Sequence, residues 1–63
     1  MTVPVVIVEM LEGRTADQKR ALIAAITQAM VDAVKADPAS VRIIIHDNAR
    51  ESWGRDGKQM TDV

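Results

Sequence analysis

The chain has 63 residues, a hydrophobic fraction of 48%, no cysteine, one histidine and a net charge of −1. These values exclude disulfides, argue against a structural zinc site and, with no basic run, give no support for nucleic-acid binding. A chain of this length forms one domain, over residues 1–63. Neither a signal peptide nor a membrane-length apolar run is visible, so we expect the protein in the cytoplasm.

The first element is predicted to be a strand over residues 4–10. Pro4 suits a first strand position, and β-branched residues dominate the run that follows. The run is almost continuously apolar, which is typical of a strand that is covered on both faces.

A turn over residues 11–14 leads into a predicted helix. Thr15 and Gln18 have the spacing of a capping box, and the helix should run to about Lys35, because the residue before Pro38 avoids the helical region. Apolar residues at helical spacing predict its buried stripe: Leu22, Ile23, Ile26, Met30, Ala33 and Val34.

A second strand is predicted over residues 41–46, then a polar loop over 47–52 and a hairpin turn at Asp56-Gly57. Strand, helix and strand form a β-α-β unit with two parallel strands. The expected fold class is therefore α+β, with one long helix and a short C-terminal hairpin. One helix leaves an apolar sheet face bare, and a chain this short has a marginal core, so we expect a homo-oligomer.

Two arginines allow a functional and a structural interpretation. Arg14 precedes a helix N-terminus, where the helix dipole disfavours a cation. It either binds an anion or is a solvated turn residue that pairs with Glu12 or Asp17. Arg42 either clamps a substrate carboxylate or rests its stem on the sheet with its head in solvent.

Parallel neighbouring strands begin at the same sheet edge, so Pro4 and Arg42 should lie together. Arg14 should lie on the order of 25–30 Å from Pro4 along the extended segment. These three residues can therefore meet only if Arg14 comes from a neighbouring subunit.

The chain has a single aromatic residue and a single histidine. Trp53 can wall a pocket or anchor an interface, and one ring can do both. His46 is either an acid–base candidate or a polar residue at a strand end.

Together, Pro4, Leu11-Glu12-Gly13-Arg14-Thr15, the run over residues 40–45 and Trp53-Gly54-x-x-Gly57 resemble the 4-oxalocrotonate tautomerase family. The resemblance runs without gaps from Pro4 to near the C-terminus. It implies a hexamer, arranged as a trimer of dimers, with a role in aromatic catabolism. The implied reaction is a cofactor-free keto–enol tautomerisation of an unsaturated 2-hydroxy or 2-oxo acid.

The resemblance also implies a role for each matching residue. Pro4 would be the amino-terminal general base, and Arg42 would hold the reacting end of the substrate and stabilise the enolate. Arg14 would bind the distal carboxylate, while Trp53 and Leu11 would line an apolar pocket. The substrate would be a small carboxylate, and no metal is implied.

The sequence departs from the family pattern before Pro4. Met1-Thr2-Val3 precede this proline, so its nitrogen is an amide without basicity in the chain as numbered. Two interpretations follow. One is an active tautomerase in which an alternative start at Val3 and trimming expose Pro4. The other is a non-catalytic or weakly active oligomer of the same fold. Arg55 also stands where family members usually carry an apolar residue.

Overall fold

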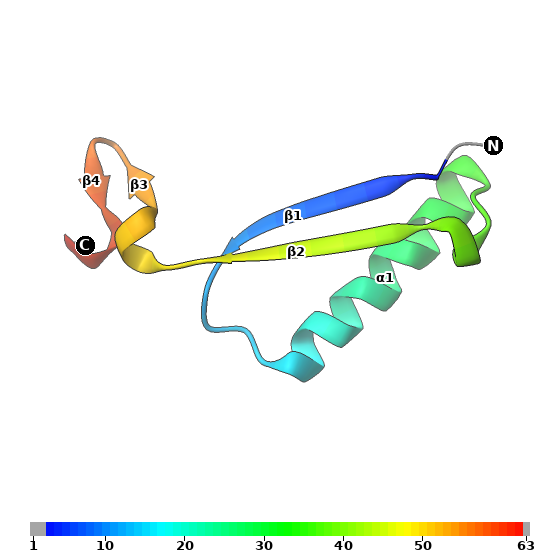
Figure 1. Ribbon diagram of the computed structural model, residues 1–63, viewed down its shortest axis with the longest axis horizontal. Coiled ribbons are helices and arrows are strands. Elements are labelled where there is room, and N and C mark those ends of the chain that lie inside the picture. Colours follow the sequence, from blue (N-terminus) through cyan, green and yellow to red (C-terminus); the bar gives the residue numbers. More distant parts are fainter. Residues whose placement is uncertain (1–2, 63) are drawn as a thin grey trace.

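The structure is a computed structural model that describes residues 3–62, and it contains a β-α-β unit followed by a short antiparallel hairpin (Figure 1). Met1 and Thr2, which belong to the segment before Pro4, lie outside the described residues. The strands are β1 (Val5–Leu11), β2 (Arg42–Asn48), β3 (Gly54–Arg55) and β4 (Lys58–Gln59). The helices are α1 (Ala16–Val34) and the 3-10 turns η1 (Pro38–Ser40), η2 (Arg50–Ser52) and η3 (Met60–Asp62). The predicted fold class is confirmed.

Strands β1 and β2 are parallel, with Val5 opposite Arg42 and Leu11 opposite Asn48. The second strand extends beyond its predicted end at His46. Backbone pairing with β1 continues there, and the Asn48 side-chain amide donates to the Met10 carbonyl at 3.2 Å. The sequence of this segment reads as polar loop, but its hydrogen bonds to the neighbouring strand keep it extended.

Helix α1 begins at the predicted capping box. The Gln18 N–H donates to the Thr15 hydroxyl at 3.1 Å, and the Thr15 N–H donates to Gln18 Oε1 at 2.9 Å. The helix ends where Lys35 takes the left-handed conformation, with φ 60°. No helix in the described part of the chain is long and apolar enough to cross a membrane.

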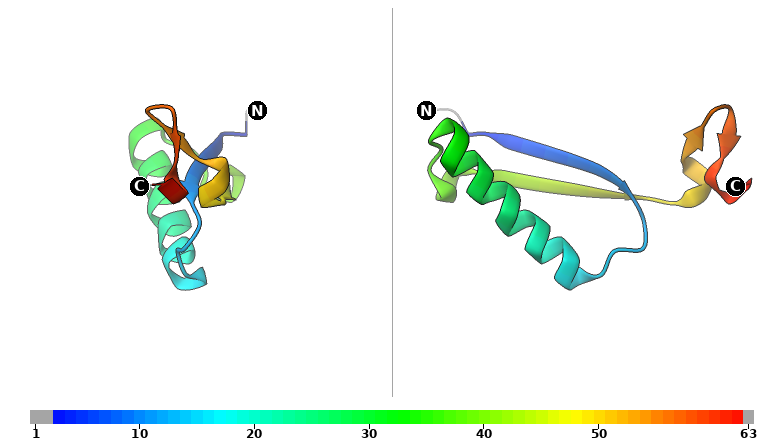
Figure 2. Two further views of the ribbon diagram at one scale, coloured as in Figure 1. Left: turned by 90° about the vertical axis from the view of Figure 1, so that its left-hand side faces the viewer. Right: turned by 180° about the vertical axis from the view of Figure 1, so that it is seen from behind.

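The helix covers one face of the β1–β2 pair (Figures 1 and 2). Alternate strand residues on that face are half-buried: Val6, Val8, Ile43 and Ile45. Of the predicted stripe, Leu22, Ile26 and Met30 are half-buried, whereas Ile23, Ala33 and Val34 are exposed. Two strands make a sheet too narrow to cover the whole stripe. Val41 is the only buried hydrophobic residue among those described.

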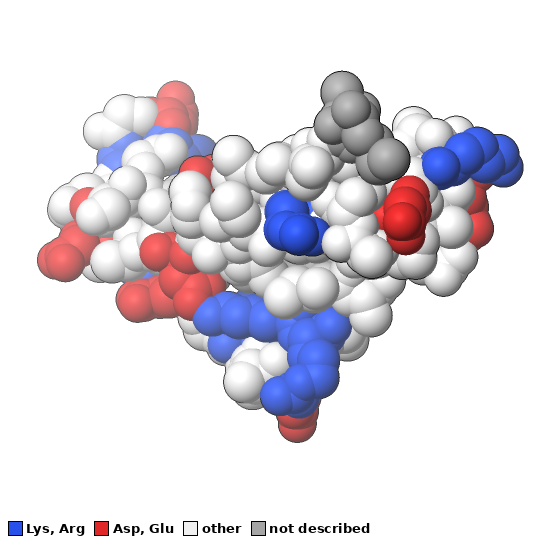
Figure 3. All heavy atoms as spheres, turned by 45° about the vertical axis from the view of Figure 1, so that its right-hand side comes forward, with Lys and Arg blue, Asp and Glu red and all other residues white. Residues whose placement is uncertain are grey.

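The face of the sheet without a helix is open and mainly apolar, as predicted, and it also carries Glu9, Arg42 and His46. Val5, Ile7 and Ile44 on this face keep exposed fractions of 53%, 56% and 42%. A broad uncharged area is also visible in Figure 3. The radius of gyration is 14.8 Å, whereas a compact chain of this length would have about 11 Å. One protomer therefore does not enclose a core of its own.

The C-terminal hairpin turns at Asp56-Gly57, as predicted. Both residues have positive φ, 54° and 76°, as a tight two-residue hairpin turn requires. The hairpin lies beyond the carboxyl ends of β1 and β2, at the opposite end of the molecule from the start of β1 (Figure 2).

Candidate active site

A hollow of about 560 Å³ lies at the carboxyl ends of β1 and β2. Three of the predicted site residues, Leu11, Arg14 and Trp53, line it together. The hollow combines an aliphatic wall, an aromatic wall and a guanidinium group, which is a combination suited to a small organic anion. Further residues that line it are Glu9, Glu12 and Arg50.

The backbone fixes where Leu11 and Arg14 lie. Leu11 is the last residue of β1, and the next N–H, from Glu12, donates to the Asn48 carbonyl at 2.9 Å. Gly13 then takes φ 121°, a conformation open to glycine, and turns the chain toward α1. The short turn through Gly13 therefore places Arg14 close to the end of β1.

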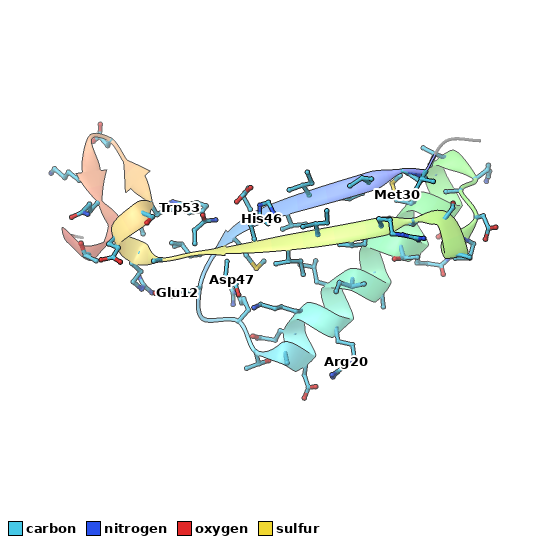
Figure 4. The ribbon with its side chains drawn as sticks, in the orientation of Figure 1. Glu12, Arg20, Met30, His46, Asp47 and Trp53 are labelled. Atoms are coloured by element: carbon cyan, nitrogen blue, oxygen red, sulfur yellow. The ribbon has the colours of Figure 1, made fainter. Side chains whose placement is uncertain are left out.

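Trp53 is held from both sides. Its N–H donates to the Arg50 carbonyl at 3.2 Å, and its own carbonyl accepts from the Met60 N–H at 2.9 Å. The ring is half-buried and lies beside the carboxyl ends of the strands (Figure 4). Both η2 and the hairpin thus determine the position of this wall of the hollow.

Arg14 forms no ion pair within 4.0 Å with any side chain that the structure describes. Arg14 is an exposed turn residue, as the structural interpretation expects, but its pairing with Glu12 or Asp17 is not observed. Asp17 instead pairs with Arg20 on the first turns of α1. Arg14 remains available to a ligand or to a neighbouring subunit.

Pro4 and Arg42 lie together at the other end of the sheet, where the Arg42 N–H donates to the Pro4 carbonyl at 2.9 Å. The Arg42 side chain is exposed, and Nη1 donates to the Ala39 carbonyl at 2.9 Å and the Val41 carbonyl at 3.3 Å. A guanidinium has five N–H donors. Arg42 therefore helps to hold η1 and keeps further donors for a ligand.

One protomer does not bring all five predicted site residues together. The seven-residue strand β1 separates Pro4 from Leu11 and Arg14, a span of roughly 23 Å. Pro4 and Arg42 therefore lie at one end of the sheet, and Leu11, Arg14 and Trp53 lie at the other end.

His46 belongs to a polar cluster with Glu9 and Asn48, and of these three only Glu9 also lines the hollow. Its Nδ1 lies 2.7 Å from Glu9 Oε2, and the Asn48 amide donates to Glu9 Oε1 at 3.0 Å. The hydrogen bond from Asn48 and then that from His46 lower the pKa of Glu9 below its ordinary value of 4.5. The neighbouring Asp47 points to the other side of β2 and pairs with Lys19 of α1 (Figure 4). Through this cluster, His46 of β2 contacts Glu9 of β1.

Sequence reasoning missed Arg50, which lines the hollow with Arg14. Its position directly after β2, at the same sheet edge as Arg14, is the signal that could have found it. A second hollow of about 280 Å³ lies beside Arg14 and is lined by Met10, Gln18, Lys19 and Leu22. No group of three His, Cys, Asp or Glu side chains placed to hold a metal ion occurs in the part of the chain that the structure describes.

Comparison with known proteins defines the family to which this chain belongs. The family model of the tautomerase enzymes matches residues 4–63, and the chain belongs to this family. A 2-hydroxymuconate tautomerase of Comamonas testosteroni is 53% identical over 45 residues, which cover 71% of each chain. A probable tautomerase of Halalkalibacterium halodurans is 34% identical over 59 residues, covering 94% of this chain and 97% of that one.

Solved structures agree with this assignment. A structure from the 4-oxalocrotonate tautomerase isozymes of Methylibium petroleiphilum has a TM-score of 0.88 and 45% identity, over 92% of this chain and 94% of that one. A heterohexamer 4-oxalocrotonate tautomerase from Chloroflexus aurantiacus has a TM-score of 0.90 and 32% identity, over 95% and 97%. The resemblance read from the sequence is confirmed.

Proposed function

We propose that the protein is a cofactor-independent tautomerase that interconverts keto and enol forms of unsaturated 2-hydroxy and 2-oxo acids, with the Pro4 amine as general base. One observation carries this proposal: the residues that match the tautomerase family begin at Pro4 and include the hollow formed by Leu11, Arg14 and Trp53. The similarity to a 2-hydroxymuconate tautomerase indicates the substrate class.

The proposed reaction needs one group that both accepts and returns a proton. A free α-amine has a reference pKa of about 7.7–8.0, and desolvation with nearby cations lowers it toward neutral pH. The Pro4 amine takes the proton from the 2-hydroxyl, the conjugated double bonds shift, and the ammonium returns a proton to carbon. The amine is regenerated, so no cofactor takes part.

The arginines divide the remaining work. Arg42 holds the reacting end of the substrate through its free N–H groups and stabilises the charge that develops on the enolate oxygen. Arg14 holds the distal carboxylate. Trp53 and Leu11 form the apolar wall, which strengthens both charge interactions by excluding water.

The proposed active site is shared between subunits. A small unsaturated acid is far shorter than the strand that separates Pro4 from Arg14, so Arg14 must come from a neighbouring copy. The exposed apolar sheet face and the elongated protomer support assembly. We infer a hexamer, a trimer of dimers, for which the heterohexameric relative is a precedent.

The proposed active form has Pro4 at its amino terminus, because a nitrogen linked to Val3 is an amide. A second candidate function follows from this same feature: the chain that retains residues 1–3 would be a carboxylate-binding or structural oligomer with little activity.

Kinetics on a panel of 2-hydroxydienoates, 2-hydroxymuconate included, would compare the form that starts at Pro4 with the full chain. We expect activity higher by orders of magnitude in the first, with a pH profile whose basic side reports the Pro4 amine. Equal, substantial activity in both forms would remove Pro4 as the base.

A further inference from the structure

We propose that Arg50 is a second anion-binding arginine of the hollow and that it acts with Arg14 to select ligands that carry a distal carboxylate. This inference rests on the proposed function in one respect: that function identifies the bound carboxylate as the distal end of a substrate.

The geometry places the two arginines at equivalent points of the fold. The Glu12 N–H donates to the Asn48 carbonyl at 2.9 Å and thereby joins the ends of β1 and β2. Arg14 follows Glu12 by two residues, and Arg50 follows Asn48 by two residues. Each arginine therefore leaves the same hydrogen-bonded edge of the sheet, and both line the hollow of about 560 Å³.

Local hydrogen bonds hold the Arg50 backbone against the aromatic wall. The Arg50 carbonyl accepts from the Trp53 N–H at 3.2 Å, and the Ser52 N–H donates to the Ala49 carbonyl at 2.9 Å. These bonds close η2 and place the backbone of Arg50 next to that of Trp53. Both residues line the same hollow, so one ligand there can contact both.

The charges near the hollow leave both guanidinium groups available. Within the set of side chains that the structure describes, neither Arg14 nor Arg50 has an acidic oxygen within 4.0 Å. Two carboxylates also line the hollow, but Glu9 already accepts hydrogen bonds from His46 and Asn48. Glu12 forms no ion pair with either arginine, so the N–H donors of both guanidinium groups are left for the carboxylate of a ligand.

The test is a pair of NMR titrations with adipate, a dicarboxylate, and hexanoate, a monocarboxylate of the same chain length. They are run on the full chain and on the form that starts at Pro4, with the variants Arg50→Gln, Arg50→Lys, Arg14→Gln and the double variant. Arg20→Gln is the matched control, since it removes the same charge from an exposed position of α1 away from the hollow (Figure 4). Sedimentation of each variant reports its assembly.

In the form that starts at Pro4, we expect Arg50→Gln to weaken adipate binding about tenfold while hexanoate changes little. Arg50→Lys should restore part of the loss, and the double variant should lose less than the product of the single losses, because both arginines hold one carboxylate. The Arg20→Gln control should bind both acids as the unaltered protein does.

The inference would be overturned if Arg50→Gln weakened the binding of both acids equally or left adipate binding unchanged. It would also be overturned if the variant changed the assembly and showed no preference for adipate. The readout is binding, so it separates the two proposals. Selective loss of adipate binding in a protein without tautomerase activity would support the arginine pair and count against the proposed function. Tautomerase activity in a protein whose adipate affinity does not change on substitution of Arg50 would support the proposed function and count against the arginine pair.

Discussion

Arg42 combines a structural contact with its proposed catalytic one, and the two roles can be separated. Its Nη1 donates to the Ala39 carbonyl at an exposed position and to the part-buried Val41 carbonyl at 3.3 Å, so the loss of these two bonds should have a smaller effect than the loss of the proposed substrate contact. Its other N–H groups face no carboxylate among the described side chains. The catalytic role should therefore dominate the effect of a substitution.

Arg42→Ala in the form that starts at Pro4 should lower kcat/KM by a factor that corresponds to about 2–4 kcal/mol of transition-state stabilisation. The thermal midpoint should change little, and Arg42→Lys should recover only part of the rate because it lacks the planar fork. Steady-state kinetics and thermal unfolding measure the two effects. Unchanged turnover would show that Arg42 does not hold the reacting end.

At the scale of single elements, α1 depends on its capping box. Thr15→Ala removes the acceptor of the Gln18 N–H and should lower the free energy of unfolding by about 1 kcal/mol, whereas Thr15→Ser should retain it. Urea denaturation at fixed protein concentration measures both. Equal stability of the alanine and serine variants would show that the cap contributes nothing.

The polar cluster between β1 and β2 should make stability depend on pH. The folded state lowers the pKa of Glu9 below 4.5, so the contribution of this carboxylate is present above that value and is lost as the pH falls through the lowered pKa. Glu9→Gln should therefore lower the thermal midpoint slightly at neutral pH, and the difference should vanish in acid. A difference that stays constant across this range would exclude the linkage.

The same elements show how far the sequence alone can predict the fold. The capping box at Thr15 and the turn at Asp56-Gly57 depend on local chemistry, and both occur where they were predicted. The extension of β2 to Asn48 depends on hydrogen bonds to Met10 across the sheet, which no local pattern reveals. Arg50 could have been found from its place two residues after β2, at the same sheet edge as Arg14, but it lies outside the residues that carry the family resemblance.

The candidate site was predictable in part. The separation of Pro4 from Arg14 follows from strand length alone, and the grouping of Leu11, Arg14 and Trp53 matches the family pattern. The exposure of Ile23 and Val34, expected in the core, follows from the narrow width of a two-stranded sheet, which a helical stripe does not specify.

On the scale of the whole molecule, the open sheet face should be the assembly surface. Ile7→Lys places a charge at the most exposed of the apolar residues on that face, with 56% exposure in the protomer, and should dissociate the oligomer. Gln28→Lys, at an exposed polar position of α1, is the control and should leave the assembly intact. Analytical ultracentrifugation separates the two results. An intact hexamer in the Ile7 variant would place the interface elsewhere.

The central claim is that each active site joins Pro4 of one copy to Arg14 of another, and subunit mixing tests it most directly. One partner is the full chain, whose Pro4 is blocked and whose Arg14 is intact. The other starts at Pro4 and carries Arg14→Ala. Each has little activity alone at low dicarboxylate concentration.

The two chains are unfolded together in equal amounts, refolded and assayed below the KM. A site shared between neighbours predicts that activity returns to about a quarter of that of the unaltered form that starts at Pro4, because half of the sites have a free proline and half of their neighbours have Arg14. Activity no greater than the sum of the separate proteins, in a mixture shown to contain hybrid oligomers, would contradict the shared site.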